Sequence, residues 1–497
     1  MAEQKQDTAS SLKEVISHAK EYGFVFPSSE IYDGLQAVYD YGQNGVELKN
    51  NLKTLWWKAM TMLNDNIVGI DASIFMHPLT WKASGHVDSF NDPMIDNKDS
   101  KKRYRADTLL EDKAAQYDAE GKPEVGKALL QNMAKCLDAG DLEGVRQLII
   151  DENIKCPVSN TGNWTEVRQF NLMFSTQVGA VSEDASLIYL RPETAQGIFV
   201  NFLNVQKTGR MKMPFGIAQI GKAFRNEIVA RNFIFRMREF EQMEMQFFCR
   251  PGTEMEWYNK WKENRLKFHK AIGLPAENLK YHDHEKLAHY ANAAVDIEYK
   301  FPFGFKEIEG IHSRTDFDLS AHQGLSKKKQ QYFDADLDEN GKPYGNYIPY
   351  VVETSVGADR LFLATLCNAY TEETTGEGEN LKQRTLLKFH PAVAPIKVAV
   401  LPLVKKDGLA EKAEDIFHLL KRSFNTTYDD GGAIGKRYTR QDLIGTPYCI
   451  VVDYQTMEDN TVTIRHRDTM EQERVAIDSL KEKIGYEVSL ERVFEQL

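Results

Sequence analysis

The chain has 497 residues, of which 42% are hydrophobic, and its formal net charge is −11. This length suggests two to four domains with sizeable cores, and the negative charge means that nucleic-acid binding would depend on local basic patches. Five scattered cysteines argue against a disulfide framework and favour a cytoplasmic protein. The polar N-terminal segment lacks a signal-peptide pattern and no run of eighteen apolar residues occurs, so we expect no membrane span.

Residues 1–91 contain two predicted helices. The first, over residues 9–19, has apolar positions at helical spacing: Leu12, Val15, Ile16 and Ala19. The second follows the turn at 42–45 and has a longer apolar stripe: Val46, Leu48, Leu52, Leu55 and Trp56. Such a stripe is more often core or a subunit interface than a ligand site.

Residues 92–160 are highly charged and poor in aromatic residues, which predicts an inserted helical region with loops. Near its end, Cys156 is followed three residues later by Ser159. A second cysteine at that position would indicate half of a zinc site, and no other cysteine pair is near. The sequence therefore predicts no zinc.

The segment 213–248 contains two strand-like runs around an arginine-rich loop, which predicts a β-hairpin. Polar residues recur in it at period two, so we expect Arg225 and Glu227 to share one face of the first strand. On the second strand one face carries four residues: Phe240, Gln242, Glu244 and Gln246. A half-buried sheet normally turns apolar residues inward, so this face suits a polar, charged and partly aromatic ligand.

Three further segments carry unusual polar groups on predicted strands: 191–197, 307–314 and 353–360. In the last, Gly357 permits a tight turn and Arg360 lies in the first turn of a helix that begins near Ala358. A helix N-terminus with a guanidinium suits a phosphate, and Arg225 could bind another through two hydrogen bonds.

Each of these groups also has a plainer interpretation. Arg225 and Glu227 could form a surface ion pair of little energetic value, and Phe240 could belong to the core. Their coincidence on one antiparallel sheet favours a site. Neither a phosphate-binding G-x-x-x-x-G-K-[ST] loop nor a dinucleotide-binding G-x-G-x-x-G after a strand occurs, so the parallel-sheet nucleotide folds are not supported.

Residues 371–390 are acidic and contain glycine, as is typical of a linker or exposed loop. After Pro391, alternating strand and helix patterns predict a small α/β domain with a partly parallel sheet. We therefore expect an N-terminal part of a larger domain (1–91), an insertion (92–160), a core (161–390) and a C-terminal domain (391–497). The basic cluster around 436–440 is, taken alone, a solvated surface.

Several strings resemble the class II aminoacyl-tRNA synthetases. FRNE at 224–227 resembles their motif 2, and GADRLFLATL at 357–366 resembles motif 3. RPETAQGIFVNF, FRMREFEQMEMQFF and ETSVGADR are similar, more narrowly, to the glycyl-tRNA synthetases of the homodimeric type, and DDGGAIGKRYTRQDLIGTPYCIVVD resembles the anticodon-binding domain of that family. The likeness runs from about Ser29 to the C-terminus. It departs at Gln43, where the family usually has a proline in motif 1.

The resemblance implies an α+β fold: a class II catalytic domain with a mostly antiparallel sheet flanked by helices, an inserted helical region and a C-terminal α/β anticodon-binding domain. It implies that glycine is attached to its tRNA in two steps, through glycyl-adenylate formed from glycine and ATP. The expected cofactor is ATP with Mg²⁺. The expected partners are glycine, tRNA for glycine and a second copy of the chain.

For ATP, the resemblance implies that Arg225 and Arg360 are catalytic, with Arg225 on the α-phosphate stabilising the charge of the transition state. Glu227 would accept from the adenine amino group, and Phe240 and Arg360 would lie on either side of the ring. Arg236 would contact the phosphates and Glu307 would hold Mg²⁺. The whole implied ATP set is Arg225, Asn226, Glu227, Phe235, Arg236, Met237, Arg238, Glu239, Phe240, Glu307, Ile308, Gly357, Ala358, Asp359 and Arg360.

For glycine, the resemblance implies that Glu193, Glu244 and Glu353 surround the ammonium and leave no room for a side chain. The whole implied glycine set is Arg105, Glu193, Phe240, Glu241, Gln242, Met243, Glu244, Arg314, Glu353, Thr354, Ser355, Val356 and Gly357, with Arg105 and Arg314 near the carboxylate or the adenylate. The candidates for tRNA phosphates are Lys436, Arg437, Arg440 and Arg465.

Two rival functions remain open at this point. A synthetase-like paralogue without catalysis would be expected to have lost Arg225, Glu227 or Arg360, and all three are present. A class II ligase for another amino acid, such as proline or threonine, would not be expected to line its pocket with three carboxylates.

Overall fold

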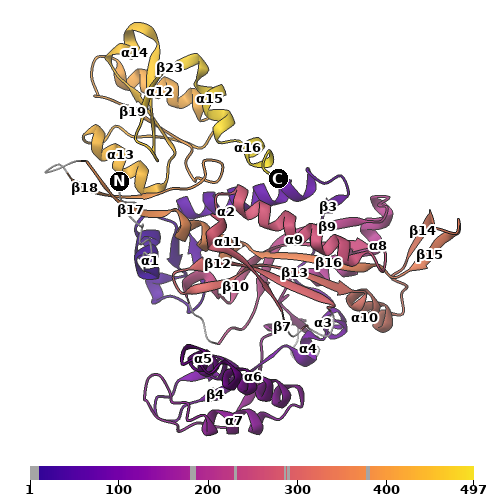
Figure 1. Ribbon diagram of the computed structural model, residues 1–497. Coiled ribbons are helices and arrows are strands. Elements are labelled where there is room, and N and C mark those ends of the chain that lie inside the picture. The colour runs from indigo at the N-terminus through magenta and orange to yellow at the C-terminus, as the bar shows by residue number, and fades with distance from the viewer. Residues whose placement is uncertain (1–10, 180–185, 229–231, 285–286, 288–290, 377–380) are drawn as a thin grey trace.

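Figure 1 shows the computed structural model of the chain, which describes residues 11–179, 186–228, 232–284, 287, 291–376 and 381–497. Both helices expected near the N-terminus are present as α1 (Leu12–Glu21) and α2 (Gln43–Thr61), although residues 9 and 10 of the first prediction lie outside the described residues. Gln43 is the first residue of α2. The missing family proline therefore falls at a position that needs no backbone donor.

A seven-stranded sheet forms the centre of the molecule, in the order β11-β12-β13-β16-β10-β9-β3. Every neighbouring pair is antiparallel except β3 with β9, so the expected mostly antiparallel sheet is confirmed. The strands are β3 (Ile67–Gly69), β9 (Phe215–Phe224), β10 (Glu239–Cys249), β11 (Leu279–Asp283), β12 (Ala293–Phe301), β13 (Gly304–Thr315) and β16 (Tyr350–Gly357).

The predicted hairpin is confirmed, since β9 and β10 pair in register from Phe224 with Glu239 to Phe215 with Phe248. One detail of that prediction was wrong. The first strand ends at Phe224, so Arg225 and Glu227 lie in the loop beyond it rather than on one strand face. Residues 229–231 of this loop lie outside the described residues.

Three helices cover one face of the sheet: α2, α9 (Glu254–Ala271) and α11 (Ala358–Ala369) (Figure 1). Their apolar side chains and the inward-facing strand residues form the largest buried cluster, which includes Trp56, Phe268, Met243, Val356 and Phe362. Burial of this size is the main stabilising contribution to such a domain. A second apolar cluster, which includes Phe202, Ile217 and Phe248, packs on part of the opposite face, and the rest of that face carries polar side chains.

Shorter elements border the opposite face. They are α3 (Pro78–Ala83), α4 (His86–Ser89), α8 (Ala195–Thr208) and α10 (Phe317–Ser326). The smaller strand pairs are β1 (Val25–Pro27) with β2 (Tyr39–Tyr41), which packs with α1 and α2, β7 (Ser175–Val178) with β8 (Ser186–Tyr189), and β14 (Tyr332–Leu337) with β15 (Pro343–Tyr347). Single 3₁₀ turns are η1 (Glu30–Tyr32), η2 (Phe233–Phe235), η3 (Ala276–Asn278) and η5 (Ile477–Ser479). No helix within the described ranges is both long and apolar enough to cross a membrane.

The charged insertion has its own core, as its composition suggested. Its helices are α5 (Ala106–Ala119), α6 (Pro123–Asp138) and α7 (Leu142–Asp151), and its sheet has the order β5 (Arg103–Arg105), β4 (Asn91–Asp96), β6 (Arg168–Asn171). In Figure 1 it lies below the central sheet. Because β6 pairs with β4, this unit continues past residue 160.

Two C-x-x-C-like positions meet inside the insertion. Cys156 Sγ lies 3.2 Å from Ser100 Oγ, and Ser159 Oγ donates to Asn97 Oδ1 at 2.9 Å. The pairs 97/100 and 156/159 thus have the spacing of a zinc knuckle, but three of the four residues are not thiols. Hydrogen bonds therefore connect the two turns.

The C-terminal domain is the expected small α/β unit with a partly parallel sheet, in the order β20-β19-β21-β22-β23. Strands β20 and β21 run parallel to β19, and the remaining pairs are antiparallel. Its elements are β19 (Val398–Pro402), α12 (Leu409–Leu420), β20 (Thr426–Tyr428), α13 (Ile434–Ile444), β21 (Tyr448–Val452), α14 (Tyr454–Asp459), β22 (Thr461–His466), β23 (Gln472–Ala476), α15 (Leu480–Glu487) and α16 (Leu490–Phe494).

The linker expected over 371–390 is instead a hairpin, β17 (Tyr370–Thr375) with β18 (Lys382–Leu387); residues 377–380 lie outside the described residues. Ion pairs stabilise it where apolar residues are scarce. Arg384 donates to Glu373 Oε1 at 2.6 Å and to Asp442 Oδ2 of the C-terminal domain at 3.0 Å. This partly buried arginine connects the hairpin to the C-terminal domain.

Candidate functional site

Adjacent strands bring polar side chains together on the open face of the central sheet. In the β10–β16 pair Glu244 lies opposite Ser355 and Gln246 opposite Glu353, and in the β13–β16 pair His312 lies opposite Glu353. Side chains of directly opposed residues lie on the same face within contact distance. The expected period-two face of the second hairpin strand is therefore confirmed, and it continues across three strands.

Five of the predicted ligand residues point away from this face, because alternate strand residues face opposite sides. The side chains of Met243, Ile308, Val356 and Ala358 are buried in the core beneath the helices. Thr354 lies on the same side of β16 and is fully buried. Expecting these five side chains to contact a ligand was therefore wrong.

Two acidic residues at the site border have a structural partner. Asp359 accepts from Lys49 Nζ at 2.6 Å and from the backbone N–H of Glu241 at 2.7 Å. The Glu241 carboxylate lies 3.1 Å from Lys49 Nζ and 2.6 Å from Lys53 Nζ. Both carboxylates therefore bind lysines of α2 at the border of the site.

At one end of the polar face a cavity opens to the solvent. Its lining is rich in arginine and aromatic residues: Arg225, Glu227, Ile234, Phe235, Arg236, Met237, Phe240, Glu241, Gln242, Glu307, Ser355, Gly357, Asp359 and Arg360. The structure thus brings together most of the residues predicted for ATP, from β10, β13, β16, the hairpin loop and the start of α11.

The Nε atom of the Arg225 guanidinium is fixed by a hydrogen bond. Its Nε donates to the Pro192 carbonyl at 3.0 Å, and its guanidinium lies 5.2 Å from the centre of the Phe240 ring. Within the described residues its two terminal nitrogens make no hydrogen bond. They are therefore available to an anion in the cavity, for which a guanidinium is geometrically matched.

Arg360 lies across the cavity on the first turn of α11. Its Nη1 donates to Glu307 Oε2 at 2.8 Å, and its guanidinium stacks 4.4 Å from the centre of the Phe235 ring. Glu307 reaches this position because of a β-bulge opposite Ile297 and Glu298. Without the bulge, Glu307 would face the same side as Glu309, whose carboxylate binds Arg265 and His269 of α9.

Two predicted ATP ligands hold the loop itself. Arg238 Nε donates to the Glu227 carbonyl at 3.0 Å, and its Nη1 donates to the Gln36 carbonyl at 3.2 Å. Glu239 pairs with Lys222 at 2.9 Å on the hairpin surface. Expecting their side chains to contact ATP was wrong, since both are committed to neighbouring strands and loops.

Carboxylates and amides form a closed network at the other end of the polar face. Gln246 Nε2 donates to Glu244 Oε1 at 2.8 Å and to Glu353 Oε2 at 2.7 Å. Thr194 Oγ1 donates to the second oxygen of Glu244. Glu353 also accepts from Arg314 Nη1 at 3.1 Å. Glu244 and Glu353 are only 2% and 5% exposed, so this end excludes water.

The three carboxyl groups have different protonation tendencies. Burial raises the pKa of Glu244 well above its usual range, and the charges of Glu353 and Glu193 raise it further. Burial also opposes ionisation of Glu353, but Arg314 and His312 hold its pKa below the usual range. In the same way His86 and Arg314 outweigh burial and lower the pKa of Glu193 to about 2. These surroundings therefore favour ionisation of Glu193 and Glu353 and disfavour ionisation of Glu244.

The two arginines predicted near the glycine carboxylate lie at different ends of the polar sheet face. Arg314 is buried between Asp318 and Glu353, at the carboxylate end. Arg105 pairs with Asp92 and Asp107 in the insertion, and the nearby Glu227 carboxylate helps to raise the pKa of its guanidinium. Arg105 therefore lies toward the cavity end, nearer Glu227 than the carboxylate network.

Sequence reasoning missed four supporting residues of the network: Thr194, Gln196, His312 and Asp318. Gln196 donates to Glu193 Oε1 at 3.0 Å and to Asp318 Oδ1 at 2.9 Å. Thr194 and Gln196 stand in the string RPETAQG and His312 stands beside Arg314, so they were visible as polar residues. No local pattern showed which carboxylate each would support.

The candidates for tRNA contact separate into two groups in the C-terminal domain. Lys436 and Arg440 are exposed, with Arg440 paired to Asp429. Arg437 is 3% exposed and binds the carbonyls of Pro402 and Gly432, and Arg465 is 5% exposed and binds Asp442. Expecting Arg437 and Arg465 at the surface was wrong, because both guanidinium groups satisfy buried acceptors.

Comparison with known families and curated proteins bears on this geometry. Residues 397–486 match the family described as an anticodon binding domain, and residues 92–131 and 124–172 match that of glycyl-tRNA synthetase insertion domain 1. The chain is 54% identical to the glycine–tRNA ligase of Chlorobaculum tepidum over 475 residues, which cover 95% of this chain and 98% of that protein. It is 51% identical to that of Treponema denticola, covering 97% and 98%.

Two solved structures share the fold at low identity. A prolyl-tRNA synthetase of Cryptosporidium parvum, complexed with halofuginone and AMPPNP, superposes with a TM-score of 0.60 at 13% identity, covering 99% of this chain and 79% of that chain. The RNA binding domain of a threonyl-tRNA synthetase from the same organism gives 0.59 at 15% identity, covering 94% and 96%. Both are class II synthetases, so the expected fold class is confirmed.

Proposed function

The chain belongs to the glycine–tRNA ligase family, and from that membership we propose how its site divides the two-step reaction between its two ends. The reaction is the attachment of glycine to tRNA by way of glycyl-adenylate. A glycine carboxylate oxygen attacks the α-phosphorus of ATP and pyrophosphate leaves. A ribose hydroxyl of tRNA then attacks the glycyl carbonyl, and AMP leaves.

The arginine-lined cavity is the proposed ATP site. Its pairing of aromatic rings with guanidinium groups supports a base stacked beside Phe240 and phosphates on Arg225, Arg236 and Arg360. Arg225 presents its terminal nitrogens to the α-phosphate and stabilises the charge that develops there. A cation-binding oxygen is also present, since Glu307 can hold Mg²⁺ on ATP when Arg360 turns to the phosphates.

The carboxylate network is the proposed glycine site. Glu193 and Glu353, with depressed pKa values, supply negative charge for the ammonium, and Glu244 completes the cage. The buried contacts of Thr194, Gln246 and Arg314 fix these carboxylates in place. A rigid cage of this kind rejects a larger amino acid by steric exclusion, which matters because glycine has no side chain to recognise.

The single observation that supports this division best is the closed carboxylate network at the end of an arginine-lined cavity. Glycine-dependent exchange between ATP and pyrophosphate, measured with a panel of amino acids, tests it. We expect exchange with glycine and a large loss with alanine and serine. Equal exchange with alanine or serine would contradict the proposed steric cage.

We further propose that the chain acts as a homodimer. Ile31, Tyr32 and Leu35, around η1, are 87%, 80% and 58% exposed, an apolar group that favours a partner surface. The segment that follows Leu35 contacts the hairpin loop beside the proposed ATP site, because the Ala37 carbonyl accepts a hydrogen bond from the backbone N–H of Arg238 at 2.9 Å. Ile31→Asp with Tyr32→Asp should therefore give monomers in size exclusion with light scattering and reduce exchange. A dimer that survives both changes would place the interface elsewhere.

The C-terminal domain is proposed to bind the tRNA anticodon arm, with Lys436 as the surface cation best placed for phosphate. The family resemblance and the free cysteines support work in the cytoplasm, where thiols stay reduced. Changes to the surface of this domain should reduce the affinity for tRNA and leave the glycine-dependent exchange between ATP and pyrophosphate unchanged.

A further inference from the structure

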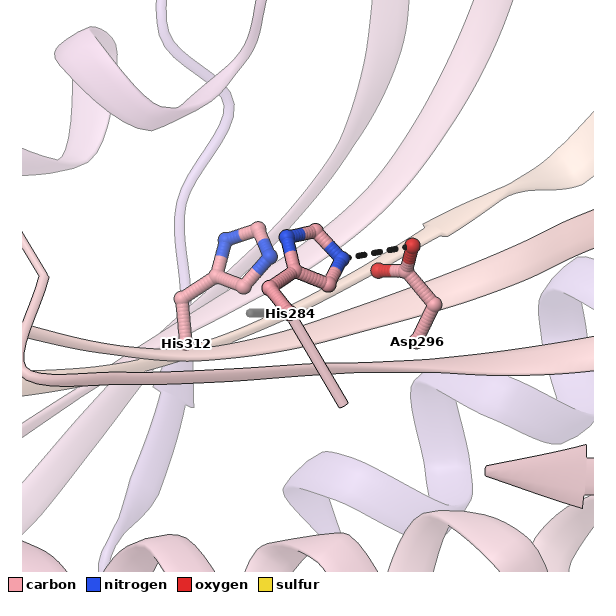
Figure 2. Close-up of side chains that lie close together, drawn as sticks. All are labelled: His284, Asp296 and His312. Carbon is pink, nitrogen blue, oxygen red and sulfur yellow. Dashed lines mark hydrogen bonds and ion pairs between the residues drawn. The ribbon is translucent and has the colours of Figure 1, made fainter. Parts of the chain in front are cut away.

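A second polar cluster lies beside the carboxylate network, on three neighbouring strands. His284 follows β11, Asp296 lies on β12 and His312 on β13. In the view of Figure 2 the His284 ring lies between the His312 ring and the Asp296 carboxylate. One nitrogen or oxygen atom from each residue lies within 4.8 Å of the others, and His284 Nε2 is 2.8 Å from Asp296 Oδ2.

The sheet register leaves space at the centre of this cluster. Asp296 pairs with Gly310, which has no side chain to fill the position between Asp296 and His312. A Cβ at residue 310 would lie 3.2 Å from His312 Nε2 and 3.5 Å from Asp296 Oδ1. The glycine therefore keeps open a small polar space bordered by a nitrogen and an oxygen.

His312 presents an unused nitrogen to this space. Its Nδ1 lies 3.0 Å from Glu353 Oε1 and donates to that carboxylate, which leaves Nε2 to act as an acceptor. Nε2 is buried and has no hydrogen-bond partner within the described residues. A histidine whose other nitrogen donates to a carboxylate is the usual arrangement of a metal-bound imidazole.

We propose that His284, Asp296 and His312 form a binding site for a divalent transition-metal ion. Two imidazoles and one carboxylate are ligands of Zn²⁺ and related ions, whereas Mg²⁺ prefers oxygen ligands alone. Zn–N and Zn–O distances near 2.0–2.2 Å place tetrahedral ligand atoms about 3.4 Å apart, and water completes the coordination. The wider separations in the cluster must therefore shorten, and the 2.8 Å contact between His284 and Asp296 must lengthen. The expectation of no zinc came from cysteine spacing, which does not test a histidine and aspartate site on separate strands.

A purely ionic cluster is the alternative. In that case His284 and His312 serve only to bind Asp296 and Glu353, and the cluster gains nothing from a metal. The neighbouring Glu307 carboxylate adds negative charge and helps, after burial, to raise the pKa of Asp296. Direct measurement of metal binding separates the two, because only the proposed site binds one ion with all three ligands.

The test uses the full chain, stripped with a chelator and then titrated with Zn²⁺ by calorimetry and with Co²⁺ by absorption spectroscopy. We expect one ion per chain, with a Co²⁺ spectrum of nitrogen and oxygen ligation. His284→Ala and Asp296→Asn should each weaken binding at least tenfold. His282→Ala, an exposed histidine two residues away, is the matched control and should bind as the unmodified chain does. No stoichiometric binding, or equal binding by all variants, would overturn the proposal.

Gly310→Ala provides a test that keeps every ligand. Its methyl group would occupy the open space, so metal binding should fall while circular dichroism and the melting temperature without metal stay close to those of the unmodified chain. Unchanged Zn²⁺ affinity in this variant would mean that the ion binds outside the space between Asp296 and His312, which also overturns the proposal.

Metal binding is expected to affect the carboxylate network through the His312–Glu353 hydrogen bond, a consequence that depends on the proposed role of Glu353 in glycine binding. A metal ion adds positive charge next to that carboxylate, so Zn²⁺ should raise the KM for glycine several-fold and leave the KM for ATP unchanged. His284→Ala should abolish this response. An unchanged KM with Zn²⁺ bound would reject the coupling alone, and loss of all glycine-dependent exchange in metal-free protein would reject the proposed function instead.

Discussion

The two ends of the polar sheet face differ in how their charged groups are held. At the cavity end, Arg360 and Glu307 keep 25% and 45% of their side chains exposed and have mainly each other as partner. At the carboxylate end, Glu244 and Glu353 are almost fully buried and hydrogen-bonded by Thr194, Gln246, His312 and Arg314. The first end can rearrange around a large ligand, whereas the second is already arranged for a small one.

This difference follows from what each ligand offers. A nucleoside triphosphate carries rings and several charges, so loosely held guanidinium groups can bind its phosphate oxygens. Glycine offers only an ammonium and a carboxylate, and selectivity for it depends on a cage that does not expand. We therefore expect mutations at the cavity end to reduce rate, and mutations at the carboxylate end to change both glycine affinity and stability.

The largest effect is expected for Arg225→Ala. Removal of a group that stabilises developing charge typically costs 10²–10³-fold in rate, so glycine-dependent exchange should fall by about that factor. Because the Arg225 side chain makes one hydrogen bond within the described residues, circular dichroism should not change. Lys222→Ala, an exposed residue of the same hairpin, is the control. Exchange within tenfold of the unmodified enzyme would remove Arg225 from the catalytic role.

A smaller loss is expected for Glu244→Gln. A hydrogen bond to a charged group contributes about 1.5–3 kcal/mol, so kcat/KM for glycine should fall by roughly 10–150-fold while the KM for ATP stays the same. Glu239→Gln, on the outer surface of the same strand, should leave both values unchanged. Equal losses for glycine and ATP would mean that the two ends are not separate.

The same substitution should raise stability at alkaline pH. The folded-state pKa of Glu244 is above its ordinary value of 4.5, so this carboxyl contributes stability at low pH that is lost as pH rises through the folded pKa. Glu244→Gln removes that loss, and the melting temperature of the variant should exceed that of the unmodified enzyme by about 2–4 °C at pH 8. The two should converge near pH 4. A constant difference across this range would contradict a buried, protonated Glu244.

The smallest effect is expected outside both ends, for Lys436→Ala in the C-terminal domain. One exposed lysine contributes one phosphate contact, so the KM for tRNA should rise a few-fold and the salt dependence should weaken by about one ion. Exchange without tRNA should be unaffected. Thr439→Ala, exposed three residues along the same helix, provides the comparison without a charge change.

The sequence was informative where side-chain direction depends only on period. Glu244, Gln246, Glu353 and Ser355 lie on the predicted faces, because alternation in a strand needs no knowledge of its neighbours. The same alternation explains why the contiguous ligand ranges taken from the family resemblance included core residues such as Met243 and Val356. The family resemblance identifies the strand, whereas the alternation of side chains along it determines which residues face the ligand.

Other features depend on tertiary structure that no local pattern records. The β-bulge that separates Glu307 from Glu309 is visible only in the pairing of β12 with β13. Lys436 and Arg437 are adjacent basic residues, yet one is exposed and the other is buried, because helix rotation places them on different sides. The acidic segment 371–390 resembled a linker because its stabilising partners lie far away in the chain.

That hairpin has a consequence for how the two domains work together. Arg384 joins Glu373 to Asp442, Asp442 also binds Arg465, and Arg467 binds the carbonyls of Gly445 and Phe389. These contacts hold the central sheet and the C-terminal domain in one relative position. This fixes the spacing between the proposed glycine site and the proposed anticodon-binding domain, which a bound tRNA would have to span.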